Sequence, residues 1–259
     1  MQKQKHACAV QAFQDASAMN EVLHLLEMEH GGRIALHRLY ADRPTGPPVI
    51  IAHGTISNAE TVRTLGMFLV ERGFDCWLLE WAGHGHSVPA SPKQNFEYPA
   101  FHDLSTAVRA VLHRTQQPRV LWVAHSGGGH LPLMYLTRHP EKQSRFAGIV
   151  TMGTQSTHAA PRFREKTVGV VLWCITMLMN RTPKAILPLG NKPEPTRLLL
   201  QWAEWNMKQR WLGADGTRLY GSIGRTDGTC RCHSRQSQIT YSQRPQLLPQ
   251  PKKVRKATQ

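Results

Sequence analysis

The residue with the clearest capacity for chemistry is Ser126. It lies within the run VLWVAHSGGGH from Val120 to His130, an apolar segment followed by a serine with small neighbours. This layout is typical of a nucleophile elbow, a sharp strand-to-helix turn that exposes one hydroxyl. Because the backbone of such a turn is strained, the positions two before and two after the serine must be small. They are Ala124 and Gly128, so we predict that Ser126 is a nucleophile.

A second motif, His53-Gly54-Thr55, follows the apolar run Val49–Ala52. That run suits a strand buried on both faces, and ligands of open parallel sheets bind at the carboxyl ends of strands. The backbone N–H groups of Thr55 and Gly127 would then form a two-donor oxyanion hole. One such donor typically contributes ~3 kcal/mol of transition-state stabilisation. A simple turn after a strand is the alternative interpretation.

The elements that would position these residues follow from hydrophobic patterning. Alternating residues over 21–27 and 33–40 indicate a β-hairpin. Short apolar runs at 49–52, 75–79, 120–124 and 146–152 indicate buried strands, and the segments 61–72, 101–114 and 131–139 between them have helical spacing. This rhythm predicts an α/β fold, a doubly wound, mostly parallel sheet with helices on both faces and the hairpin at one edge.

A third motif, EWAGHGHS, runs from Glu80 to Ser87. In their order and spacing the three motifs resemble those of the alpha/beta hydrolase superfamily, over residues 21 to 217. The resemblance implies an eight-stranded fold, a serine esterase or lipase-like activity through an acyl-enzyme on Ser126, and oxyanion donors at Gly127 and Thr55. Ala82 replaces the arginine common in the third motif, which puts the usual salt bridge of that turn in question.

The resemblance also implies a carboxylate and then a histidine after Ser126 in the chain. Beyond the following helix the histidines are His158, in no position that the family uses for its base, and His233. Asp227 and His233 have the right order, but six residues leave no room for the helix and strand expected between them. They are weak candidates, and two polar residues of a solvated tail are the favoured alternative. The catalytic acid and base are not identifiable, and without them Ser126 should be orders of magnitude slower than in an intact triad.

We divide the chain into a flexible leader (1–20), a hydrolase core with the first six strands (21–158), a tryptophan-rich helical cap (159–217) and a basic disordered tail (218–259). The tail has nine Lys and Arg against one acid and little apolar periodicity. We therefore expect a truncated fold with an incomplete C-terminal half. A change of reading frame near codon 220 would produce so abrupt a switch in composition.

Composition sets further limits. The 41% hydrophobic and 19% charged residues suit a soluble globular protein, and five scattered cysteines indicate a reducing compartment, hence a cytoplasmic location. The longest apolar stretch, Val168–Met179, is shorter than the ~20 residues of a bilayer span, so we expect no transmembrane segment. Cys230-x-Cys232-His233 lacks the four ligands of a zinc cluster, and we expect no cofactor and no metal.

The expected partner is a small apolar or acyl-ester substrate, with the cap lining its pocket. The net charge of +15 favours phosphate attraction, but the tail offers only Tyr220 and Tyr241 for base stacking, so no specific nucleic acid is expected. Two alternatives stay open: a non-catalytic homologue that binds a ligand or partner, and a truncated, poorly folding product. The oligomeric state also stays open.

Overall fold

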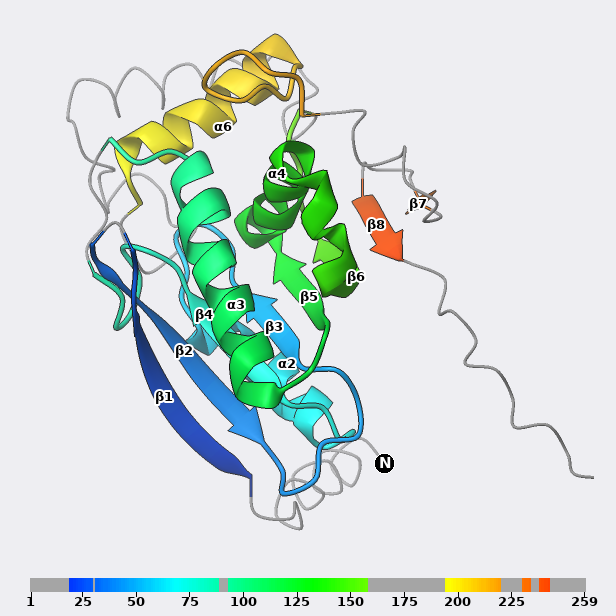
Figure 1. The fold of residues 1–259 in the computed structure, drawn as a ribbon. Helices are drawn as coiled ribbons and strands as arrows, with labels where there is room; N and C mark the ends of the chain where they lie inside the picture. Colours follow the sequence, from blue (N-terminus) through cyan, green and yellow to red (C-terminus); the bar gives the residue numbers. More distant parts are fainter. Residues whose placement is uncertain are drawn as a thin grey trace, which may run out of the picture.

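The eight strands of this computed structural model form one sheet in the order β1-β2-β4-β3-β5-β6-β8-β7, with helices on both faces (Figure 1). The structure describes residues 19–29, 31–88, 93–157, 194–219, 230–233 and 238–242. At one edge, β1 (Asn20–Glu27) and β2 (Arg33–Tyr40) form the predicted antiparallel hairpin. β2 then pairs antiparallel with β4 (Cys76–Glu80).

The centre of the sheet is parallel. β3 (Val49–Ala52) lies between β4 and β5 (Val120–His125), and β6 (Phe146–Met152) pairs with β5. All four residues of β3 are buried, as its unbroken apolar run predicts. The predicted α/β fold is thereby confirmed, with a mixed sheet in which the three central strand pairs are parallel and the four pairs toward its two edges are antiparallel.

Helices cover both faces because alternate strand residues point to opposite sides. Ile51 and Leu78 pack with α2 (Glu60–Val70) on one face. Ile50 and Trp77 belong to the larger core on the other face, which is covered by α3 (Leu104–Thr115) and α4 (His130–Arg138). In Figure 1, α2 lies behind the sheet and α3 and α4 lie in front of it.

Among the described residues, three shorter helical segments connect the strands and the α-helices. A π-helix, η1 (Pro99–Asp103), leads into α3, so the helix predicted over 101–114 begins earlier and with a wider turn. A 3-10 turn, η2 (Ser126–Gly129), connects β5 to α4, and a second, η3 (Pro140–Arg145), precedes β6. Of the predicted cap, the described part is 194–217, within the segment 194–219 that contains α6 (Thr196–Lys208).

The segment predicted to be disordered, 218–259, contains two strands, β7 (Cys230–His233) and β8 (Gln238–Ser242). β8 pairs antiparallel with β6 through Gly148↔Ser242 and Ile149↔Tyr241, and β7 pairs antiparallel with β8. The structure thus describes two strands within this segment, which the prediction did not contain, and the disorder expected for the tail stays a prediction. The prediction relied on side-chain patterning, whereas an open strand edge recruits a neighbour through main-chain hydrogen bonds that depend little on side chains.

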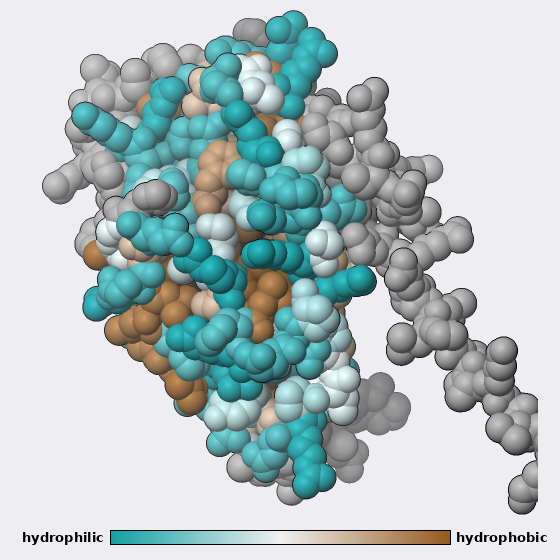
Figure 2. Space-filling view, viewed as in Figure 1, coloured by the Kyte–Doolittle hydropathy of each residue, from teal (hydrophilic) through white to brown (hydrophobic). Residues whose placement is uncertain are grey.

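The outer strand β1 exposes Val22, Leu23 and Leu25. They contribute to the apolar surface over β1 in Figure 2. Among the helices in the described part of the chain, none combines the length and the apolar content that a bilayer crossing requires.

Candidate active site

The turn after β5 has a strained backbone at Ser126. β5 ends at His125, and Ser126, the first residue of η2, has a φ of 47°. This left-handed conformation costs a residue other than glycine about 1–3 kcal/mol. Four such residues have positive φ in the described chain. Gln116 and Gln209 end helices, whereas Ser126 and Ile56 lie on the two loops predicted to form the site.

The glycines after Ser126 are required by close packing against the His53–Thr55 loop. A Cβ atom on Gly128 would lie 2.5 Å from the carbonyl oxygen of His53, and one on Gly127 would lie 3.1 Å from the backbone nitrogen of Thr55. A Cβ on Gly54 would lie 3.1 Å from the Cβ of Ser126. The structure thus brings together the three residues selected from the sequence, Ser126, Gly127 and Thr55.

A buried carboxylate holds the loop that carries Thr55. The Ile56 N–H donates to Glu194 Oε1 (2.5 Å), and the same oxygen accepts a hydrogen bond from His84 Nε2 (3.0 Å). The side chains of His84 and Glu194 are fully or almost fully buried. Thr154 adds a hydrogen bond from its hydroxyl to the Ser126 carbonyl (2.9 Å). Both loops of the site are therefore anchored by side chains from later in the chain.

His53 has a structural role in this arrangement. Its ring contacts His84 edge-on at 4.7 Å between centroids, and its Nδ1 donates to the Gly54 carbonyl (2.7 Å). Burial, and secondarily the neighbouring His84, lowers the pKa of His53 to about 3. His53 is therefore neutral at physiological pH, and its hydrogen bond holds Gly54 in the loop that carries Thr55.

His130, the first residue of α4, is also a packing residue. Its ring lies 5.1 Å from that of Phe96, 5.4 Å from Trp205 and 5.8 Å from Trp211. Burial lowers its pKa to about 4. The cluster joins α4 to α6, so part of the predicted cap packs on the helix that follows Ser126.

The turn Glu80–Ser87 lacks the cation expected from the family. The Ala82 N–H donates to Asp103 Oδ2 (2.7 Å), and Asp103 is fully buried. Burial raises the pKa of Asp103 to about 7. An arginine at position 82 would supply a positive charge in this turn, close to that carboxyl; the methyl group of Ala82 does not.

Among the residues whose side chains the structure describes, no histidine or carboxylate hydrogen-bonds the Ser126 hydroxyl. His158 and Asp227 lie outside the described residues. For His233 the backbone is described: β7 is antiparallel to β8, and β8 to β6. β7 therefore runs parallel to β6. His233 is its last residue, so it lies at the end of the sheet where the carboxyl ends of β5 and β6 also lie.

Comparison with known proteins agrees with this architecture. The model of the alpha/beta hydrolase fold family matches residues 47–180, and the chain belongs to that family. It is 24% identical over 151 residues to human lysosomal acid lipase/cholesteryl ester hydrolase, covering 50% of this chain and 38% of the lipase. It is 27% identical over 151 residues to bovine gastric triacylglycerol lipase, covering 51% and 37%.

The chain thus spans less than two fifths of the length of these lipases. Among solved structures, the esterase EaEST from Exiguobacterium antarcticum is similar at a TM-score of 0.47 and 19% identity, covering 61% of this chain and 56% of that chain.

Proposed function

We propose that this protein is a serine hydrolase that cleaves carboxylic esters or similar acyl substrates through an acyl-enzyme on Ser126. The observation that carries the proposal is the left-handed backbone of Ser126 (φ 47°) packed beside the loop of Thr55. The similarity to two lipases, of which the chain covers 38% and 37%, supports an ester as substrate.

In the proposed reaction the Ser126 hydroxyl oxygen attacks the ester carbonyl carbon, and a base accepts the hydroxyl proton. The N–H groups of Thr55 and Gly127 donate to the negatively charged oxygen of the tetrahedral intermediate. The intermediate collapses, the alcohol leaves with a proton, and water hydrolyses the acyl-enzyme to release the acid. His233 is the first candidate for the base because β7 ends there at the same sheet edge.

The proposed substrate has an apolar acyl group. Trp202 on α6 is 36% exposed and donates its Nε1–H to the Gln155 carbonyl (2.9 Å), just beyond β6. An indole ring held at this edge of the sheet offers an apolar surface to an acyl chain.

The test is hydrolysis of p-nitrophenyl butyrate by the full chain beside Ser126→Ala and His233→Ala, with His139→Ala as control. His139 is partly exposed beyond α4, away from the two loops of the site. We expect both site variants to lose at least 100-fold in kcat and the control to match the wild type. Equal rates in wild type and Ser126→Ala would contradict the proposal.

A non-catalytic ligand-binding protein is the second candidate, and the observation that favours it is the lack of a histidine or carboxylate hydrogen-bonded to the Ser126 hydroxyl among the residues whose side chains the structure describes. It predicts no serine-dependent turnover, together with a rise in Tm when a non-hydrolysable ester analogue is added. An active enzyme would show both turnover and stabilisation.

A further inference from the structure

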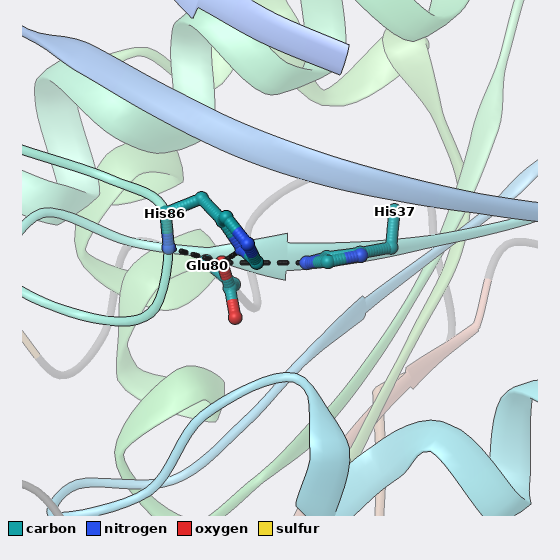
Figure 3. A group of neighbouring side chains, drawn as sticks. All are labelled: His37, Glu80 and His86. Atoms are coloured by element: carbon teal, nitrogen blue, oxygen red, sulfur yellow. Dashed lines mark hydrogen bonds and ion pairs between the residues drawn. The ribbon is translucent and has the colours of Figure 1, made fainter. Parts of the chain in front are cut away.

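Three side chains from two adjacent strands and a turn converge on one point (Figure 3). His37 comes from β2, Glu80 from the end of β4, and His86 from the following turn. Glu80 Oε2 lies 3.3 Å from His37 Nε2 and 3.2 Å from His86 Nδ1. The three potential ligand atoms all lie within 4.8 Å of one another.

These separations suit a tetrahedral metal ion. Zinc binds histidine nitrogen and carboxylate oxygen at about 2.0–2.2 Å, so two ligands of a tetrahedron are about 3.4 Å apart. The two separations that involve Glu80 already have this length. The third separation, between the ligand nitrogens of His37 and His86, is at most 4.8 Å. It can adjust to the tetrahedral length by a movement of His86, whose side chain is 58% exposed. Two histidines and one glutamate are also an established donor set for zinc with one open position.

The surroundings match those of a metal ligand set. Glu21 Oε1 lies 3.5 Å from His37 Nδ1, the ring nitrogen opposite the one that faces Glu80. A carboxylate there favours a proton on Nδ1 and leaves the Nε2 lone pair for a metal. Glu80 Oε2 also accepts the His86 N–H (2.7 Å), which orients the carboxylate. His37 and Glu80 are buried while His86 is exposed, so a metal ion could enter from solvent and keep a water ligand.

A simple charge pair is the competing explanation. The hydrogen bond to Glu80 raises the pKa of His37. Burial of Glu80 opposes ionisation, but hydrogen bonds from His37 and His86 outweigh it and lower the pKa of Glu80 to about 2. An ion pair of His37 with Glu80 needs no third group, whereas His86 directs both its backbone N–H and its Nδ1 at the same oxygen.

We propose that His37, Glu80 and His86 bind one zinc ion. The site lies on β2, on β4 and on the turn after β4, and β3 separates these strands from β5, which leads to Ser126; the site is independent of the proposed hydrolysis. Bound zinc would tie the turn that contains His84 to β2.

The test uses the full chain with Cys230→Ser and Cys232→Ser, because Cys-x-Cys-His can bind zinc by itself. After removal of metal with a chelator, zinc is titrated in competition with a chromophoric chelator. We expect one equivalent to bind, with at least a 10-fold loss of affinity in His37→Gln and in His86→Gln. His139→Gln is the matched control, since this histidine also lies near a glutamate (Glu141, 3.8 Å) but outside the cluster.

A second measurement separates binding from misfolding. Zinc at 100-fold over the Kd of the parent chain should raise the Tm of the parent by about 5 °C and that of His86→Gln by no more than about half as much. The metal-free Tm of the exposed His86→Gln variant should equal that of the parent, which shows that it folds. Absence of zinc binding in the parent, or equal affinity in the parent and both variants, would overturn the proposal.

Discussion

The Glu194 carboxylate accepts a hydrogen bond from the backbone N–H of Ile56 (2.5 Å), although 138 residues separate the two in sequence. Glu194 lies just before α6, and Ile56 directly follows the proposed oxyanion donor Thr55. Because Ile56 also has a positive φ of 57°, this contact helps to hold a strained loop. Glu194 is therefore a positioning residue for the proposed site, and sequence patterning did not find it.

Glu194→Ala should lower the free energy of unfolding by about 1–3 kcal/mol, because it leaves the Ile56 N–H and His84 Nε2 without their acceptor. If the enzyme proposal holds, kcat should fall by up to ~100-fold with KM little changed, since Thr55 would lose its alignment. Glu194→Gln keeps an oxygen for Ile56 and should recover most of the activity. The control is Glu204→Ala on α6, the helix that follows Glu194, where the ion pair of Glu204 with Lys208 spans 4.0 Å. A similar loss there would refute the assignment.

Gly128→Ala should destabilise the fold by about 3 kcal/mol in urea unfolding, because the new Cβ would lie 2.5 Å from the His53 carbonyl oxygen. The atoms that it would meet include the backbone carbonyl oxygens of His53 and Ala52, which cannot move aside as a flexible side chain could. Gly148→Ala on β6 is the comparison, since its Cβ would meet only a leucine methyl at 3.2 Å. We expect a loss below about 1 kcal/mol there. Equal losses would show that the turn at Ser126 has room for a Cβ atom on Gly128.

Trp205→Ala should cost about 3–5 kcal/mol, as removal of a buried aromatic side chain does. Trp205 is 3% exposed, stacks on Phe96 and donates to the Leu212 carbonyl (2.7 Å). Trp202→Ala on the same helix removes a 36% exposed ring and should cost about 1 kcal/mol. Chemical denaturation of both variants measures the difference, and a small effect at Trp205 would mean that α6 does not pack on α4.

Asp103→Asn should stabilise the protein at high pH. The folded-state pKa of Asp103 is raised from 3.8 to about 7 by burial. A carboxyl with a raised pKa favours folding below its unfolded value and loses that contribution as pH rises from about 4 to 7. At pH 8 the variant should therefore be more stable than the wild type by on the order of 4 kcal/mol. The two should converge near pH 4, and a difference that does not change between pH 4 and pH 8 would contradict this account.

The sequence predicted the first six strands because their signals are local. An all-apolar run such as Val49–Ala52 indicates a buried strand within four residues. The small residues around Ser126 likewise indicate a tight turn within a few positions. The contacts of Glu194 with Ile56 and His84 join residues that are 138 and 110 positions apart, and no periodicity reveals them. β7 and β8 were missed because their pairing uses the backbone. The cytoplasmic location and the domain boundaries stay predictions, and Asp227 stays, with His233, a weak candidate from the sequence for the catalytic acid and base.

Because the backbone at Ser126 is left-handed, the backbone conformation decides which residues can replace this serine without loss of stability. With φ at 47°, glycine and asparagine are the residues that fit with least strain, and valine and isoleucine fit worst. An inactive Ser126→Gly chain should therefore fold at least as stably as the parent, whereas Ser126→Val should lose stability as well as any activity. In a saturation library, a screen for abundance and a screen for turnover would rank the same substitutions differently. The gap between the two rankings measures how much folding stability this chain gives up to present a hydroxyl there.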